Sequence, residues 1–175
     1  MHRIQKIIFP HKSMAKLRIG WFSFSCCEDS SILMTELLND HWEEWKDKIE
    51  FVHARILKSN NVLKDLDVSF VEGAIANKKD HDELLHIREN SKKLVAIGSC
   101  ACTGIPSGQR NQFDEGTKAS IQYLLDRYGY ENEVVPLEKI VTVDTKVPGC
   151  PMVEAMFLKT LNKYLEEFGI VPKTA

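Results

Sequence analysis

The stretch Trp21-Phe-Ser-Phe-Ser-Cys26-Cys27-Glu-Asp-Ser30 places two adjacent cysteines between an expected strand and an expected helix. The apolar run at residues 17–22 predicts a buried strand, and residues 31–38 carry apolar side chains roughly on one helical face. The other three cysteines also follow apolar runs: Cys100 and Cys102 come after residues 94–98, and Cys150 comes after residues 140–143. Because the loops beyond the carboxyl ends of parallel strands meet at one edge of an open sheet, we expect these cysteines to converge there.

The composition is that of an ordinary globular protein. The chain has 175 residues, of which 43% are hydrophobic and 27% charged, and its formal net charge is -2. This size predicts one domain with a substantial core. The near-neutral charge gives no indication of nucleic-acid binding, and no apolar run approaches the ~20 residues of a direct membrane span. Five cysteines without an export signal indicate a reducing cytoplasm, where clustered cysteines more often bind metal than form disulfides.

Strands and helices are expected to alternate along the chain. We expect strands at residues 17–22, 50–56, 68–71, 93–97 and 140–143, helices at residues 31–38, 79–89, 117–128 and 152–168, and a long loop at residues 104–116. This alternation predicts an α/β domain with a mostly parallel five-stranded sheet and helices on both faces. A flavodoxin-like strand order is the first choice. Residues 1–15 are interpreted as a basic N-terminal arm, and residues 16–175 as this single domain.

Four of the cysteines form the candidate metal site: Cys26, Cys27, Cys100 and Cys150. Four thiolates suit either tetrahedral zinc or an iron–sulfur cluster. Structural zinc usually takes its ligands from two Cys-x-x-Cys pairs, which this sequence lacks. Adjacent cysteines point in different directions, which suits the separate corners of a cubane cluster. The pattern therefore favours an iron–sulfur cluster, with zinc and plain buried thiols as the alternatives, and a disulfide between neighbours is the weakest option.

Four sequence blocks carry a resemblance to a known superfamily. They are Gly20-Trp-Phe-Ser-Phe-Ser-Cys26-Cys27-Glu-Asp-Ser, Val71-Glu72-Gly73-Ala-Ile, Ala96-Ile-Gly98-Ser-Cys100-Ala-Cys-Thr-Gly104 and Val147-Pro-Gly149-Cys150-Pro151. Their order and spacing resemble the superfamily that contains the small subunits of nickel–iron hydrogenases and the twenty-kilodalton subunit of respiratory complex I. The resemblance covers about residues 16–168, and the Val-Pro-Gly-Cys-Pro block is its strongest single piece.

The resemblance implies a flavodoxin-like fold that holds one proximal 4Fe–4S cluster beside a large partner subunit. Carried over by position, Cys27, Cys100 and Cys150 match ligands of both branches. Hydrogenase small subunits usually have Cys-x-x-Cys in the first block, and the place of its earlier cysteine is Phe24 here. The adjacent Cys26 resembles the tandem pair of the complex I branch, so we assign Cys26 as the fourth ligand.

Further residues are expected close to the cluster. The resemblance places Glu72 beside it, where the carboxylate would have a hydrogen-bonding or proton-path role; the alternative is an ordinary helix-capping carboxylate. Gly98 and Gly149 would let the backbone approach the cluster and donate N–H groups to its sulfurs. Cys102 is the spare cysteine, and we expect it to be a small buried hydrophobic side chain.

The first functional hypothesis is the electron-transfer small subunit of a cytoplasmic nickel–iron hydrogenase. A hydrogenase-like large subunit would hold the nickel–iron centre, and further iron–sulfur or flavin subunits would exchange electrons with the cluster. No residue of this chain is assigned a catalytic role. The alternative is the corresponding subunit of a complex I-like membrane oxidoreductase, associated with the membrane only through its partners. A zinc-stabilised, non-catalytic binding module is the third hypothesis.

Overall fold

The structure is a computed structural model that describes residues 15–173. All but the last residue of the predicted N-terminal arm therefore lies outside the described residues. None of the helices in the described part of the chain combines the length and the apolar character of a bilayer span.

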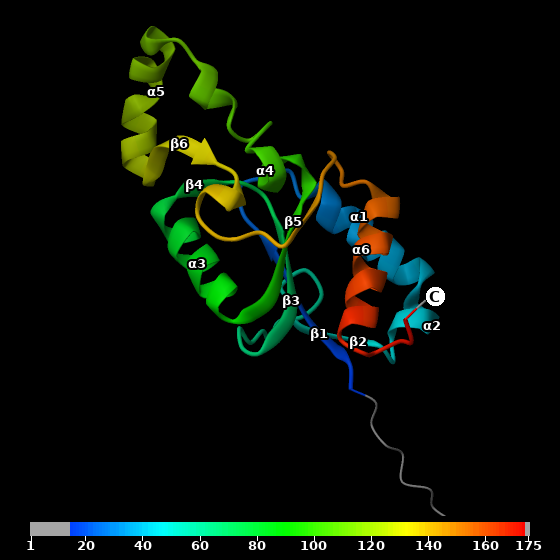
Figure 1. Cartoon of the computed structure of the whole chain (residues 1–175). Helices are drawn as coiled ribbons and strands as arrows, with labels where there is room; N and C mark the ends of the chain where they lie inside the picture. Colours follow the sequence, from blue (N-terminus) through cyan, green and yellow to red (C-terminus); the bar gives the residue numbers. More distant parts are fainter. Residues whose placement is uncertain (1–14, 174–175) are drawn as a thin grey trace, which may run out of the picture.

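A five-stranded parallel sheet forms the centre of the molecule (Figure 1). Its strands are β1 (Leu17–Ser23), β2 (Ile49–Ala54), β3 (Leu66–Glu72), β5 (Ser91–Ile97) and β7 (Thr145–Val147). Their spatial order is β2-β1-β3-β5-β7, and every neighbouring pair is parallel. Counted among these five strands alone, the order is second, first, third, fourth, fifth, which is the flavodoxin order. The predicted fold class is confirmed.

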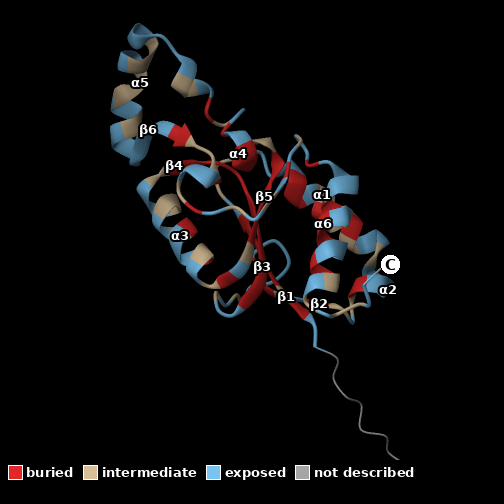
Figure 2. Ribbon diagram, in the orientation of Figure 1, coloured by how far each residue is buried: buried red, intermediate tan, exposed pale blue. Residues whose placement is uncertain are grey.

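Helices cover both faces of this sheet. On one face lie α1 (Asp29–Asp40), α2 (Trp42–Trp45) and α6 (Glu154–Glu167), and on the other lies α3 (Lys78–Glu89). Successive strand residues point to opposite faces, so Trp21 packs with α1 and α6 whereas its neighbour Phe22 packs with α3. Every residue of β3 is buried, as expected for a strand between two neighbours and under two helical layers (Figure 2).

The strand predicted at residues 140–143 is wrong. The fifth strand of the sheet is β7, and its pairing with β5 begins at Thr145. Residues 140–143 instead follow a short 3-10 turn, η2 (Leu137–Lys139), without forming a strand, and Leu137 and Val141 pack into the core. Asp144 follows this segment and is fixed to β5, because its carboxylate accepts a hydrogen bond from the backbone N–H of Leu94 at 2.8 Å. An apolar run alone does not distinguish these two uses.

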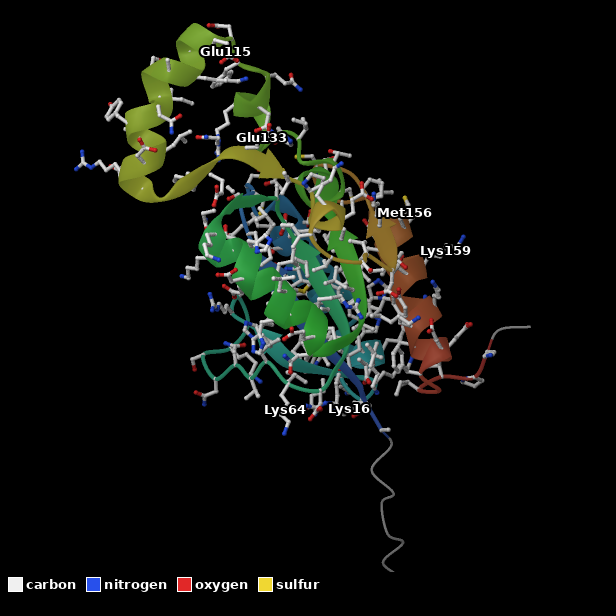
Figure 3. The ribbon with its side chains drawn as sticks, turned by 60° about the vertical axis from the view of Figure 1, so that its left-hand side comes forward. Lys16, Lys64, Glu115, Glu133, Met156 and Lys159 are labelled. Carbon is white, nitrogen blue, oxygen red and sulfur yellow. The ribbon has the colours of Figure 1, made fainter. Side chains whose placement is uncertain are left out.

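A small unit outside the five-stranded sheet was predicted only in part: the helix expected at residues 117–128 is present, whereas the strand pair was not expected. It contains an antiparallel pair, β4 (Ile75–Asn77) and β6 (Tyr130–Val135), a 3-10 turn, η1 (Gln109–Gln112), and α5 (Glu115–Tyr128). The predicted loop at residues 104–116 therefore contains η1 and the first two residues of α5. Figures 1 and 3 show α5 projecting from the body of the molecule, with Glu115 at its outer end. None of the 14 residues of α5 is buried.

Helix α1 begins without a capping side chain of its own. Its N-cap residue is Glu28, which has a positive φ of 62° and makes no side-chain cap bond. The carboxylate of Glu72, at the end of β3, takes this role: its two oxygens accept hydrogen bonds from the backbone N–H groups of Ser30 at 3.0 Å and Ser31 at 3.1 Å. The Ser31 hydroxyl donates a third bond at 2.7 Å. Glu72 is 3% exposed, so these bonds compensate a buried charge and fix α1 to β3.

The backbones after β1 and β3 also touch directly. Ser25 and Ala74 exchange two backbone hydrogen bonds, at 3.1 and 3.0 Å. Gly73 permits this approach, since it has a φ of +92° and a Cβ at this position would lie 2.7 Å from the carbonyl carbon of Phe24. The cysteine pair that follows Ser25 is thereby held against the end of β3.

Gly73→Ala tests this close approach, with Gly129→Ala as the matched control. Both glycines have positive φ, but a Cβ at Gly129 would meet nothing within 4 Å. We expect Gly129→Ala to lower the free energy of unfolding by about 1 kcal/mol, from backbone strain alone. Gly73→Ala adds a clash with backbone atoms and should cost about 3 kcal/mol or more. Urea unfolding measures both, and equal losses would contradict the close approach.

Glu72→Gln tests the cap of α1. Glutamine offers one acceptor oxygen where the carboxylate offers two, and its amide nitrogen would face an N–H or O–H donor. We expect the free energy of unfolding to fall by about 2–3 kcal/mol, because a buried donor loses its charged partner. The same change at the exposed Glu131 should stay within about 0.5 kcal/mol. Thermal or urea unfolding of the two variants gives the comparison, and a small effect at Glu72 would refute the cap.

Candidate metal centre

The turns that follow four of the parallel strands meet at one edge of the sheet. They follow β1, β3, β5 and β7, and together they line one small pocket. All seven residues predicted for the site line it: Cys26, Cys27, Glu72, Gly98, Cys100, Gly149 and Cys150. The convergence of distant cysteines expected from the strand pattern is therefore observed, and it occurs at the carboxyl edge where α/β sheets bind ligands.

The four pocket cysteines differ in their exposure. Cys100 is buried, Cys26 is half-buried, and Cys27 and Cys150 are exposed. The pocket therefore has a closed side against the sheet and an open side toward the surface. None of the four forms a disulfide, so all four sulfurs are available as donors. This donor set fits an iron–sulfur cluster or zinc, because both take thiolate ligands.

A carboxylate joins the exposed side of the pocket. One oxygen of Asp29 and the sulfurs of Cys27 and Cys150 all lie within 4.8 Å of one another. Mixed sulfur and oxygen donors at this spacing could also hold a single ion such as Zn²⁺. The positions of the protein atoms are therefore compatible with an iron–sulfur cluster and with a single zinc ion.

Burial keeps Cys26 in its protonated form in the absence of a cation. Desolvation, reinforced by the nearby negative charge of Glu72, raises the pKa of Cys26 to about 12. A thiol becomes a metal ligand only as the thiolate, so a bound cationic centre must displace this proton. The raised pKa thus describes the free protein, and it makes metal loading at Cys26 a proton-releasing step.

The two glycines of the site let neighbouring loops pack together. Gly98 has a φ of +80°, and a Cβ there would lie 3.1 Å from Ser30 Oγ. Gly149 has a φ of +119°, and its carbonyl accepts a 2.7 Å hydrogen bond from the N–H of Ser99. This bond joins helix α4 (Gly98–Thr103), which carries Cys100, to the turn that carries Cys150. Whether the glycine N–H groups also donate to a cluster stays a prediction.

Cys102 lies outside the pocket. It is buried within the core layer beside α3, and its thiol lies 3.5 Å from the carbonyl oxygen of Ala96. Burial raises its pKa to about 11, so the side chain is an uncharged thiol. The prediction that Cys102 is a small buried hydrophobic side chain agrees with this position.

Ser107 is the site residue that the sequence did not reveal. Its hydroxyl lies 3.1 Å from Cys100 Sγ and 2.6 Å from the carbonyl oxygen of Ser25. It belongs to the segment predicted as a long loop, which follows α4 (Gly98–Thr103) and brings this hydroxyl to the sulfur of Cys100. The length of the loop predicted after Cys100 indicated a functional segment, but it did not identify a particular residue.

Comparison with curated proteins finds relatives among hydrogenase subunits. A subunit of the vhu F420-non-reducing hydrogenase of Methanocaldococcus jannaschii is 28% identical over 170 residues, which covers 90% of this chain and 58% of the relative. The delta subunit of the NAD-reducing hydrogenase HoxS of Cupriavidus necator is 25% identical over 121 residues, which covers 60% of this chain and 58% of the relative. The chain thus spans little more than half the length of these relatives.

Comparison with solved structures and families agrees with this fold. A chain in the crystal structure of an NAD+-reducing [NiFe]-hydrogenase in the H2-reduced state superposes with a TM-score of 0.71 at 23% identity, over 92% of this chain and 96% of that one. The family described as NADH ubiquinone oxidoreductase, 20 Kd subunit, matches residues 26–164, a span that includes all four pocket cysteines. Since that match covers most of the sequence, the chain belongs to the family of the 20 Kd subunit of NADH ubiquinone oxidoreductase.

Proposed function

We propose that this chain is the electron-transfer small subunit of a nickel–iron hydrogenase. In this proposal one 4Fe–4S cluster is held by Cys26, Cys27, Cys100 and Cys150. The observation that carries it is the convergence of these four free thiols, from the ends of three different strands, on one pocket. The relatives support the choice of hydrogenase, because both curated proteins above are named as hydrogenase subunits.

The residues of the chain have separate roles in this proposal. When bound, the cluster supplies the means to accept and release one electron at a time. The buried Cys100 and the exposed Cys27 and Cys150 would hold the cluster together with the half-buried Cys26. Glu72 keeps the Cys26–Cys27 turn in place through its bonds to α1. The proposal assigns none of the side chains in residues 15–173 a role as a nucleophile or a general base.

The exposed side of the pocket is the side that a large partner subunit would cover. Val153 and Met156, close after Cys150, are 45% and 41% exposed, and Ile32 in the first turn of α1 is 54% exposed. Figure 3 shows Met156 on the outer surface of α6. Exposed apolar side chains close in sequence to the pocket cysteines suit a protein interface. The hydrogenase-like large subunit would supply the nickel–iron centre, with further iron–sulfur or flavin subunits downstream and a cytoplasmic location.

Two other functions have a specific observation in their favour. The tandem Cys26–Cys27 pair, with Phe24 at the place of the earlier hydrogenase cysteine, favours a complex I-like oxidoreductase subunit. The compact group of Cys27, Asp29 and Cys150 favours a zinc-stabilised binding module. Both are distinguished from the hydrogenase proposal by which metals the purified protein and its partner contain.

Paired cysteine variants test the cluster itself. Cys100→Ala removes a proposed ligand, whereas Cys102→Ala removes a buried thiol that lies two residues away and outside the pocket. We expect anaerobically purified Cys100→Ala to lose most of its iron and acid-labile sulfide, and Cys102→Ala to keep both at the unaltered protein's level. Metal and sulfide analysis gives the readout. Zinc without sulfide in the unaltered protein, or equal losses in the two variants, would refute the proposal.

The metal content of the partner separates hydrogenase from complex I-like function. We expect the large subunit that co-purifies anaerobically with this chain to contain nickel, with loss of hydrogen-dependent dye reduction when the two subunits are separated. Inductively coupled plasma mass spectrometry measures nickel and iron together. Iron and sulfide in this chain together with a nickel-free partner would favour the complex I-like alternative.

A further inference from the structure

The hydroxyl of Ser107 stands between two segments that carry proposed ligands. Its Oγ lies 3.1 Å from Cys100 Sγ and 2.6 Å from the carbonyl oxygen of Ser25, which immediately precedes Cys26. A serine hydroxyl has a single hydrogen to donate. It can therefore serve only one of these two acceptors at a time.

The carbonyl of Ser25 does not depend on Ser107. It also accepts a hydrogen bond from the backbone N–H of Ala74 at 3.0 Å. If the Ser107 hydroxyl turns toward the sulfur, this carbonyl keeps a backbone partner and no buried acceptor is left unpaired. The rotation therefore carries little cost on the carbonyl side.

The sulfur of Cys100 depends on Ser107 for a hydrogen bond more than the carbonyl of Ser25 does. It is the most deeply buried of the four pocket cysteines, so water has little access to its sulfur. Within residues 15–173, the bond from Ser107 is the hydrogen bond that the structure gives to Cys100 Sγ. As an iron-bound thiolate, Cys100 would be a pure acceptor, and Ser107 is positioned to supply the donor.

We propose that Ser107 raises the reduction potential of the cluster by donating its hydrogen bond to Cys100 Sγ. This inference rests on the proposed function, because it requires a cluster on Cys100. Hydrogen bonds to the sulfurs are among the factors that set such potentials. Negative charge on the sulfur grows when an electron is added, so the bond is stronger in the reduced state and favours reduction.

The step requires no proton transfer. One electron arrives from the partner subunit, and the same electron later leaves to the next carrier. The Ser107 proton stays on Oγ throughout, and no covalent bond of this residue forms or breaks. Rotation about the Cβ–Oγ bond is the only movement, and it turns the hydrogen from Ser25 O to Cys100 Sγ.

The test compares Ser107→Thr with Ser107→Val in the anaerobically purified complex. Threonine keeps the hydroxyl, and valine has nearly the same shape without it, so the pair separates hydrogen bonding from packing. Thr103→Val is the control, since it removes an exposed hydroxyl of the same segment that bonds the carbonyl of Ser99 at 2.8 Å. The readout is the midpoint potential in a redox titration followed by electron paramagnetic resonance, with iron and sulfide measured in each sample.

We expect Ser107→Val to lower the midpoint potential by about 59 mV, which is a tenfold change in the one-electron equilibrium constant. Ser107→Thr and Thr103→Val should keep the potential of the unaltered protein. An exchangeable deuteron coupled to the reduced centre should also be detected in the unaltered protein and in Ser107→Thr, and be absent from Ser107→Val.

The outcomes separate this inference from the function on which it rests. A full complement of iron and sulfide in Ser107→Val with an unchanged potential would overturn the role of Ser107 and leave the cluster intact. Loss of the cluster in Ser107→Val, with retention in Ser107→Thr, would also overturn it, because the hydroxyl would then be required for loading. Absence of iron and sulfide from the unaltered protein would overturn the proposed function itself.

Discussion

The buried carboxylate of Glu72 holds the turn between β1 and α1 against the end of β3, and the position of the cysteine pair depends on it. Three hydrogen bonds from Ser30 and Ser31 compensate its charge and at the same time cap a helix that has no capping side chain of its own. The backbone contact between Ser25 and Ala74 also holds this turn against the end of β3. With that turn fixed, the loops after β5 and β7 complete the pocket from the other side, joined by the bond between Ser99 and Gly149.

This arrangement makes the two sides of the pocket different. Its inner side has a buried sulfur with one positioned hydroxyl, and its outer side has two exposed sulfurs and a carboxylate. Burial near Glu72 keeps Cys26 protonated until a cationic centre arrives, so the free protein does not hold four repelling thiolates together. Exposed apolar side chains follow the two exposed cysteines in sequence, Ile32 after Cys27 and Met156 after Cys150, and under the proposed function a partner subunit would cover them.

The sequence was most informative where spacing and chemistry coincide. The alternation of strands and helices predicted the parallel sheet, and cysteines after apolar runs predicted the gathering of Cys26, Cys27, Cys100 and Cys150, because parallel strands present their ends at one edge. The sequence was least informative where contacts between distant residues determine the local structure. Residues 140–143 are apolar whether they form a strand or pack as a turn, and β4 is too short to show a period. The resemblance indicated Glu72 as a site or helix-capping residue, but its bond to Ser30 spans 42 residues and has no local signal. Ser107 reaches Ser25 across 82 residues and Cys100 across 7, and nothing in the sequence identified it.

The measurement that tests the central claim most directly is an iron-edge anomalous difference map of the anaerobically prepared complex. The account predicts one strong iron peak in this chain, of the size of a four-iron cluster, within bonding distance of the sulfurs of Cys26, Cys27, Cys100 and Cys150. A single zinc ion among Cys27, Asp29 and Cys150, or an iron centre that leaves Cys26 and Cys100 unbound, would contradict it.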